Sequence, residues 1–357
     1  MDGNNTSRQW SGNLGYLALG FPLRNPFNAL FSQEDYKFNW GMGFAVLPNS
    51  TVSYNISRTD FSDLGEEFRR NFTGTGGTYK AIWGNAIKYG DFSLGANIGW
   101  LFGQLNYERN IDFTNEQSAF DNRFINSYSL RGFYSKLGLM YVGVLNKAKA
   151  EVRDKREAPK SVSVGLTFKP SLSFSTKAEV SEINSANILA FGTLTDTLSF
   201  ITDQRGSGNL PAELAFGVNY THGLKYSVGL DIRRVFWSNY NNEANPEELE
   251  NTLRIGVGGQ FRPNPTSLKS ILARSSYRLG FYMEDDPRAL QGEQVSSYGV
   301  TMGVGLPLAW QQKFSTINIG VDIGNRSLGD LLSENFARIT FGFTFNERNW
   351  FQKRYLN

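Results

Sequence analysis

Apolar and polar residues alternate with a period of two along most of the chain. Residues 336–346 are the clearest example: they read FARITFGFTFN, with Ala, Ile or Phe at each odd position from 337 to 345. Because successive side chains of a β-strand point to opposite faces, this pattern predicts strands with one large apolar face and one small polar face. Thirteen strands are predicted, near residues 9–21, 36–47, 72–89, 91–109, 122–145, 158–178, 196–220, 224–237, 250–262, 273–285, 295–309, 314–326 and 335–347.

The content of the two faces favours a membrane barrel over a soluble sandwich. The apolar face is large and aromatic, whereas the polar face is rich in Gly and small hydroxyl residues with isolated charges. Many strands are longer than the usual 5–6 residues of globular sheets, and about 10 tilted residues cross a membrane. A charge on the lipid face costs about 2–4 kcal/mol at mid-membrane, and the charges fall on the polar face. We therefore predict an all-β fold, a transmembrane antiparallel β-barrel of about 14 strands. The alternative is a large soluble β-sandwich or barrel.

The predicted connections alternate between short and long. Tight turns are expected at 89–91, 221–224 and 310–313, and long polar loops at 50–70, 111–122, 181–194, 238–250 and 324–334. Transmembrane barrels have short turns on the periplasmic side and long loops outside. The tight turns and the end of the last strand are therefore predicted to be periplasmic.

The odd number of strands needs an explanation, because bacterial single-chain barrels close with an even number. Either two strands are merged, most plausibly around 179–220, or a first strand precedes residue 1. Residues 1–7 read as a loop, so we expect the numbering to begin inside an external loop. The predicted domains are one barrel over 1–347 and a short periplasmic tail over 348–357.

Composition removes several other classes of protein. The 357 residues include no cysteine, which excludes disulfides and cysteine-based zinc sites. The 36 basic and 33 acidic residues give a net charge of +3, too weak an excess to suggest a nucleic-acid partner. No apolar run of about 18 residues predicts a membrane helix. No signal peptide is visible, as in any mature secreted chain. No cofactor or metal is expected, and the predicted location is the bacterial outer membrane.

Several stretches, in this order, resemble the FadL-like outer-membrane β-barrel family of bacteria with type IX secretion. They are 15–22 (GYLALGFP), 43–57 (GFAVLPNSTVSYNIS), 74–88 (GTGGTYKAIWGNAIK), 94–105 (LGANIGWLFGQL), 258–266 (GGQFRPNPT), 298–308 (YGVTMGVGLPL) and 315–327 (STINIGVDIGNRS). The resemblance implies a 14-stranded barrel, often with an N-terminal hatch, that passes hydrophobic molecules or serves in the type IX machinery. The chain departs from the family in lacking the hatch and a first strand. It also continues past the last strand as RNWFQKRYLN instead of ending on Phe.

Charged residues on the polar faces are the candidate site. They are Glu213, Asp231, Arg233, Arg254, Arg278, Asp322 and Arg338, all predicted to line the lumen. One interpretation is a structural ion-pair ladder that fills the lumen. The other is a charged constriction that selects anions or carboxylate head groups, since rings of charge set pore selectivity.

Three other motifs have a structural explanation. His222 is the sole histidine and falls in a tight turn, and no serine can be placed beside it as a Ser–His pair requires, so an enzyme is disfavoured. The Gly-rich run 74–77 lacks the Lys-Ser/Thr ending of a phosphate loop and suggests a flexible strand. The acidic run 284–286 has oxygens that suit Ca²⁺, but a solvated loop or a lipopolysaccharide-bridging site is favoured.

These features support two hypotheses of function. The first is passive uptake of hydrophobic or amphipathic small molecules, from an external pocket into the lumen and out through an opening in the wall. Proline-containing stretches at 47–49 and 262–265 would permit kinks in that wall. The alternative is a structural barrel subunit beside a type IX protein secretion translocon. Expected partners are outer-membrane lipid and lipopolysaccharide, with hydrophobic small molecules or proteins of a secretion complex. Nucleic acid is not expected.

Overall fold

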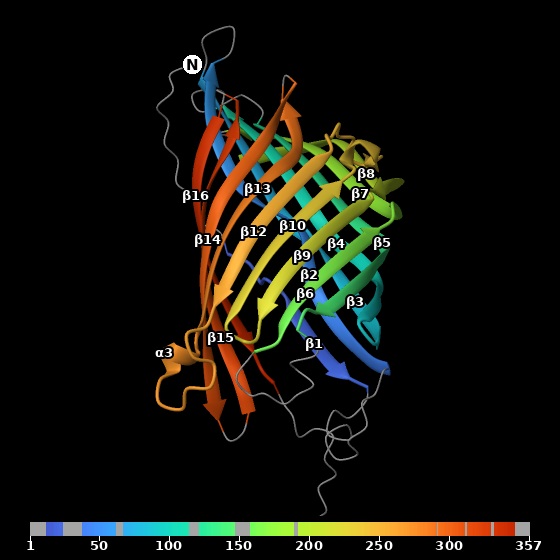
Figure 1. The fold of residues 1–357 in the computed structure, drawn as a ribbon. Helices are drawn as coiled ribbons and strands as arrows, with labels where there is room; N and C mark the ends of the chain where they lie inside the picture. The colour runs from blue at the N-terminus through green and yellow to red at the C-terminus, as the bar shows by residue number, and fades with distance from the viewer. Residues whose placement is uncertain are drawn as a thin grey trace, which may run out of the picture.

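A computed structural model describes residues 12–23, 38–61, 67–113, 121–146, 158–188, 192–290, 292–310, 313–329 and 332–346. They form one antiparallel sheet, which confirms the predicted all-β fold (Figure 1). Its strands are β1 Leu17–Pro22, β2 Phe38–Phe61, β3 Glu67–Tyr89, β4 Phe92–Phe113, β5 Asp121–Val144, β6 Lys160–Lys169, β7 Leu172–Ile188, β8 Gly192–Leu210, β9 Glu213–His222, β10 Tyr226–Val235, β11 Asn241–Asn242, β12 Thr252–Phe261, β13 Ser276–Leu290, β14 Glu293–Trp310, β15 Lys313–Leu328 and β16 Leu332–Thr344. A 3-10 helix, η1 (Trp237–Asn239), and a short helix, α3 (Ile271–Arg274), lie in connections. Among the described residues, no helix has the length and apolar character that a membrane span needs.

The sixteen strands occupy thirteen positions in the wall, apart from the short β11. β6 and β7 pair with successive halves of β5, and they in turn pair with β9 and β8. β6 and β7 therefore share one strand position, which is broken at Pro170, and β8 and β9 share another, which is broken at Pro211. Proline breaks the ladder because it cannot donate a backbone hydrogen bond. The strand count from sequence agrees with this arrangement, and the region 179–220 contributes a break but no additional position. Among the described residues, the sheet ends at β1 and β16, each of which pairs on one side.

Three predicted long loops are wrong. Most of 50–70 belongs to β2 and β3, most of 181–194 to β7 and β8, and most of 324–334 to β15 and β16. These stretches are rich in Thr, Ser and Asn, which resembles loop composition, yet they continue the register of their hairpins. The tight turns at 89–91 and 221–224 are confirmed, and the segment 238–250 is a connection that contains η1 and β11.

The outward face of the wall is apolar and exposed. Exposed fractions reach 65% at Trp100 and 75% at Phe341, because these side chains point away from the barrel. Aromatic pairs such as Trp100 and Phe133, with ring centroids 5.8 Å apart, join neighbouring strands on this face. An exposed aromatic wall is the surface that a hydrocarbon environment requires.

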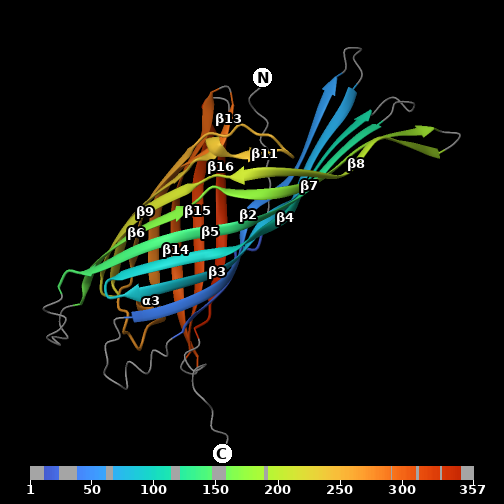
Figure 2. The same ribbon diagram turned by 90° about the vertical axis from the view of Figure 1, so that its right-hand side faces the viewer.

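Part of the wall bends away from the rest of the barrel. Figure 2 shows the ends of β2–β5, β7 and β8 running obliquely outward. We call residues 50–61, 67–77, 104–113, 121–131, 172–188 and 192–210 the flared part. The bend coincides with a register shift between Pro48 and Ser50 in β2 and with Gly76, whose φ of 105° favours glycine. The predicted kink at 47–49 is thus present and the run 74–77 lies within β3, whereas 262–265 follows the end of β12.

The two faces exchange character at the bend. Below it, on β4, the outward residues are Ile98 and Trp100; above it, on the same face, they are Gln104 and Asn106. The inward face changes in the opposite sense, from Asn97 to the buried Leu105. The core of the molecule accordingly lies on the inward face, near and above the bend.

Candidate functional site

The inward face carries a polar network in the lower wall. All seven predicted site residues lie on this face, by the register of β9 through β16. Arg233 and Arg254 are directly opposite each other on β10 and β12. Both donate to Glu284 of β13, at 2.7 and 2.8 Å, so this carboxylate bridges two guanidinium groups. Both arginines thus pair with Glu284, which the sequence analysis placed in an acidic run favoured as a solvated loop.

A second group lies on β13, β15 and β16. Arg278 donates to the amide oxygens of Gln260 and Asn318, at 3.0 and 2.9 Å. Asp322 accepts a hydrogen bond from the Tyr282 hydroxyl at 3.1 Å and lies 3.9 Å from the Arg338 guanidinium. Asp231 is opposite Gly217 and Gly256, which leave room for its carboxylate.

The third group is a cluster of lysines around Glu213. Lys136 forms an ion pair with Glu213 at 2.7 Å. Lys80 and Lys169 also lie within electrostatic range of Glu213, and Lys80 lies 5.2 Å from the centre of the Tyr134 ring. We call Lys80, Lys136, Lys169 and Glu213 the lysine cluster. Three cations around one carboxylate leave an excess of positive charge, which favours an anion at this point of the lumen.

Sequence reasoning missed the lysines and the partners of the arginines. Lys80, Lys136 and Lys169 have the same strand parity as the predicted residues, so the alternation alone contained the signal. The pairing of Glu284 with two arginines depends on which strands are neighbours, which alternation does not give.

Two apolar clusters lie above the lysine cluster on the same face. One consists of Leu101, Leu130 and Phe174, and the other of Leu105, Tyr128 and Ala178. All six are buried; Leu101 is 1% exposed. On a barrel wall, such burial requires something to cover the residues from the inside.

The cover is the connection between β10 and β12, which we call the strap (residues 236–251). Its β11 pairs with β8, and the Glu243 amide donates to the Ser207 carbonyl at 3.0 Å. The Tyr240 ring stacks on Phe174 with centroids 6.4 Å apart, and Ala244 packs against the second cluster. The strap therefore closes the apolar region from the lumen.

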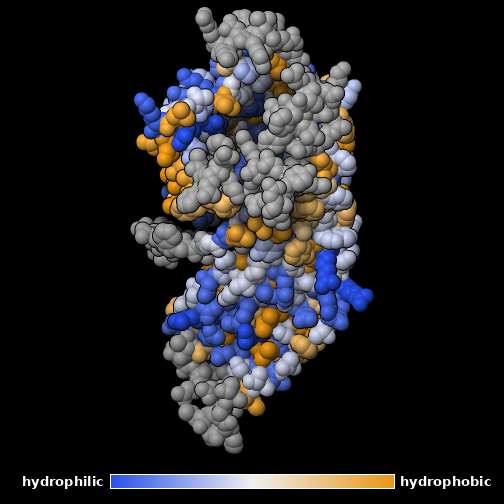
Figure 3. Space-filling view, turned by 90° about the horizontal axis from the view of Figure 1, so that it is seen from below, coloured by the Kyte–Doolittle hydropathy of each residue, from blue (hydrophilic) through white to orange (hydrophobic). Residues whose placement is uncertain are grey.

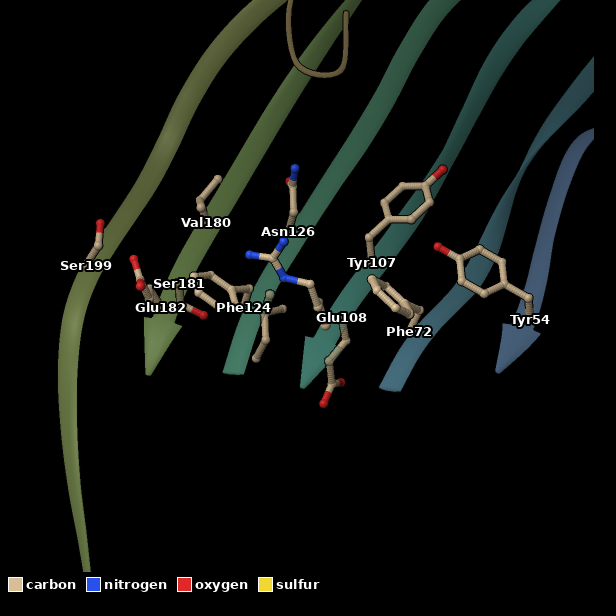
Figure 4. A pocket seen from close by; sticks show the side chains of 12 residues that line it. Tyr54, Phe72, Tyr107, Glu108, Phe124, Asn126, Val180, Ser181, Glu182 and Ser199 are labelled. Carbon is tan, nitrogen blue, oxygen red and sulfur yellow. The ribbon is translucent and has the colours of Figure 1, made fainter. Parts of the chain in front are cut away.

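A pocket of about 290 Å³ lies above the clusters, on the inward face of the flared part (Figure 4). Its aromatic wall comes from four adjacent strands, β2 to β5, which contribute Tyr54, Phe72, Tyr107 and Phe124 in that order. Arg109 lies over the Phe124 ring at 4.2 Å, and Glu182 and Asn126 add polar groups. A concave site with aromatic walls and a few polar groups suits a small molecule with an apolar body.

Burial shifts the pKa of three tyrosines: Tyr107 lines this pocket, and Tyr128 and Tyr240 belong to the apolar clusters below it. Desolvation raises the pKa of Tyr107, Tyr128 and Tyr240 above the usual value for phenols. The Tyr240 hydroxyl accepts a hydrogen bond from the side-chain amide of Asn242 at 3.2 Å.

The remaining motifs occupy structural positions. His222 is the last residue of β9, at the tight turn, with its ring 6.1 Å from Tyr226. In the acidic run 284–286, Glu284 pairs with arginines and Asp286 with Arg288 at 2.7 Å. The described residues contain no group of three His, Cys, Asp or Glu side chains arranged for a metal ion.

Comparison with known proteins gives one family and several structures. A family model described as BamG matches residues 1–357. The chain is similar to the Ralstonia pickettii toluene transporter TbuX (TM-score 0.47, 13% identity, 87% of this chain and 78% of that one) and to the CymD monoaromatic hydrocarbon channel (0.47, 12%, 92% and 85%). It is also similar to a Pseudomonas aeruginosa FadL homologue (0.47, 12%, 87% and 70%). The chain has no match among curated proteins.

The family model supports the predicted resemblance to an outer-membrane barrel family, and none of these descriptions mentions type IX secretion. The predicted location, the bacterial outer membrane, is confirmed.

Proposed function

The chain belongs to the BamG family, and we propose that it is an outer-membrane barrel for passive uptake of amphipathic, preferentially anionic small molecules. The observation that carries the proposal is a succession of sites along the inward face. On β4 the order from the outer end is Tyr107 in the aromatic pocket, then Leu105 and Leu101 in the apolar clusters. Lys80 of the lysine cluster is directly opposite Leu101.

The succession fits the chemistry of an amphipathic anion. Tyr107 and Leu101 are six positions apart on β4, a distance on the order of 20 Å. An apolar body would leave the aromatic pocket, pass under the strap and bring its charged group to the lysines. The excess positive charge of the lysine cluster supports the preference for anions.

The strap is the proposed gate, because it covers the apolar clusters. Asn209 of β8 and Asn241 of β11 are cross-strand partners, and antiparallel partners have Cα separations that a disulfide accepts. Replacing both by cysteine would lock the strap on the wall. Because the chain has no cysteine of its own, no other disulfide competes.

The test is uptake of radiolabelled decanoate by intact cells that express the chain. We expect faster uptake than in cells without it, a loss of the gain in the oxidised N209C/N241C variant, and recovery on reduction. The matched control is Ser161→Cys with Thr221→Cys, a cross-strand pair near the tight turns, whose oxidation should leave uptake unchanged. Uptake that is identical with and without the chain would contradict the proposal.

A second candidate function is that of a structural subunit in an outer-membrane assembly. The family name suggests a context of outer-membrane protein assembly, and β1 and β16 present two sheet edges among the described residues. Extraction in mild detergent followed by native mass spectrometry separates the two candidates. A single barrel with a bound small amphiphile supports transport, whereas a stable multi-barrel assembly without one supports the subunit role.

A further inference from the structure

The outward surface holds a cavity at the bend, which we call the elbow pocket. It measures about 720 Å³, and most of its lining side chains point outward from β1–β5, among them Leu17, Phe44, Trp83, Ile98, Trp100 and Phe133. Its lining is almost entirely apolar. The walls of barrels are convex toward lipid, so a hollow of this size follows from the outward bend of the flared part above it (Figure 2).

The surface directly above the elbow pocket is polar and basic. Arg131 lies two residues from Phe133, on the same strand and face. Ser129, two residues further along β5, pairs with Lys177 of β7, which pairs with Arg205 of β8. Outward neighbours of these three cations include Ser129, Ser175 and Ser207, which donate and accept hydrogen bonds. Glu179 lies on the same face, two residues from Lys177 on β7. Figure 3, seen from below, shows a broad hydrophilic area in its lower half, where the flared part extends, beside hydrophobic surface.

The charge of this surface is not neutralised within the described chain. Asp203 pairs with Lys177 at 2.5 Å. Within the described ranges, no carboxylate forms a salt bridge with Arg131 or Arg205. Three cations and two carboxylates, Asp203 and Glu179, leave an excess of one positive charge beside the apolar hollow.

We propose that the elbow binds one phosphorylated glycolipid of the outer leaflet, the lipid A part of lipopolysaccharide. An acyl chain would fill the apolar hollow, and a phosphate would be held by Arg131, Lys177 and Arg205. Charge-assisted hydrogen bonds from guanidinium and ammonium groups to phosphate are the strong ones. The hydroxyl and amide groups on the outward face of the flared part match the sugar of the head group.

The side of the membrane identifies the lipid. The flared part lies at the end of the barrel opposite the tight turns, and tight turns are periplasmic in this class of barrel. The elbow therefore faces the outer leaflet, which consists mainly of lipopolysaccharide, and not the phospholipid of the inner leaflet.

The test is native mass spectrometry of the purified full chain with three probes: diphosphoryl lipid A, phosphatidylglycerol and inorganic phosphate. We expect wild-type protein to retain lipid A in preference to phosphatidylglycerol. The R131Q/K177Q/R205Q variant should weaken lipid A binding about tenfold or more. The control K88Q/K225Q/K269Q removes three cations elsewhere and should bind lipid A like wild type. Trp100→Ala should also lower lipid A binding, because it removes one wall of the hollow.

Each alternative result overturns the proposal. Equal retention of phosphatidylglycerol, or full displacement by inorganic phosphate, would show a phosphate preference without a glycolipid site. Unchanged lipid A binding in the triple variant would contradict the role of the cations, provided that heat-modifiable mobility shows a folded barrel. A protein found on this surface instead of lipid A would assign the elbow to a partner chain.

Discussion

The wall below the bend and the flared part above it have the same strands but opposite faces. Below the bend, outward side chains are apolar and inward ones are small or charged, as with Ile98 and Asn97. Above it, the outward face of β4 carries Gln104 and Asn106. Gln104 donates a hydrogen bond to the Ser127 hydroxyl of β5 at 2.9 Å, and this hydroxyl donates to the side-chain oxygen of Asn106. The inward face there carries Leu105 and Tyr107.

This difference shows what surrounds each region. Strands β3 to β5 continue across the bend in unbroken register, so the secondary structure does not change there. The exchange of apolar and polar residues between the two faces therefore reflects a change in what each face contacts. Outward apolar residues below the bend face hydrocarbon, and outward polar residues above it face water or head groups. The flared part buries its own apolar face under the strap, as a soluble sheet does.

The strongest test of the contrast places a charge on the same face on either side of the bend. Ile98→Arg puts a guanidinium against hydrocarbon and should destabilise the protein by about 2–4 kcal/mol. Thr75→Arg, on the exposed outward face of the flared part, should cost less than about 1 kcal/mol. Urea unfolding in lipid vesicles measures both. Equal costs would mean that the two regions face the same environment.

The inward face below the bend can be tested through the lysine cluster. Glu213→Gln leaves Lys80, Lys136 and Lys169 without their shared carboxylate and should cost about 2 kcal/mol, less than the full cost of a deeply buried pair. Lys136→Gln removes one of the three repelling cations and should cost less than Glu213→Gln. The same unfolding measurement decides; a larger cost for Lys136→Gln would show that the excess of positive charge is compensated elsewhere.

The bend itself depends on glycine. At Gly76 a Cβ would lie 2.2 Å from the Gln104 carbonyl oxygen, and φ is 105°. Gly76→Ala should therefore cost about 1–3 kcal/mol. Gly165→Ala, on the inward face of β6, would bring a Cβ no closer than 4.0 Å to the Leu139 carbonyl oxygen and should stay within about 0.5 kcal/mol of wild type. If both substitutions are neutral in unfolding experiments, the bend does not require Gly76.

The smallest effect concerns an outward ion pair of the flared part. The hydrogen bond from Arg123 at 2.8 Å lowers the pKa of Glu108 below its usual value. A lowered pKa in the folded state stabilises above the usual carboxyl pKa and is lost as the pH falls through the lowered one. The β4–β5 hairpin should lose about 0.3–1 kcal/mol of protection below roughly pH 4, measured by hydrogen exchange. Glu108→Gln should remove this dependence, and a wild-type profile flat over that range would be inconsistent with the pair.

The sequence predicted the lower wall well, because one rule, apolar outside and polar inside, holds there. Residues 315–326 and 335–345 alternate as expected, and their register places Asp322 opposite Arg338. The same rule failed above the bend, where polar outward residues made 50–70 and 181–194 look like loops.

Pairing in the candidate site was not predictable from alternation. Parity gives the face of Arg233 and Glu284, but their contact at 2.7 Å depends on strand order and on the stagger between β10 and β13. The strap was expected only as a polar loop, since nothing in the stretch around Tyr240 indicates that it folds inward onto Phe174.

The central claim is that the chain leaves the hydrocarbon at the bend. Because the chain lacks cysteine, single spin labels can be placed on the outward face of β4 at Leu94, Ile98, Asn106 and Asn110 in lipid vesicles. Collision rates with oxygen should be high at 94 and 98, and rates with a water-soluble nickel chelate should be high at 106 and 110. Labels at 106 and 110 that collide with oxygen as often as the one at 98, and rarely with nickel, would contradict the account.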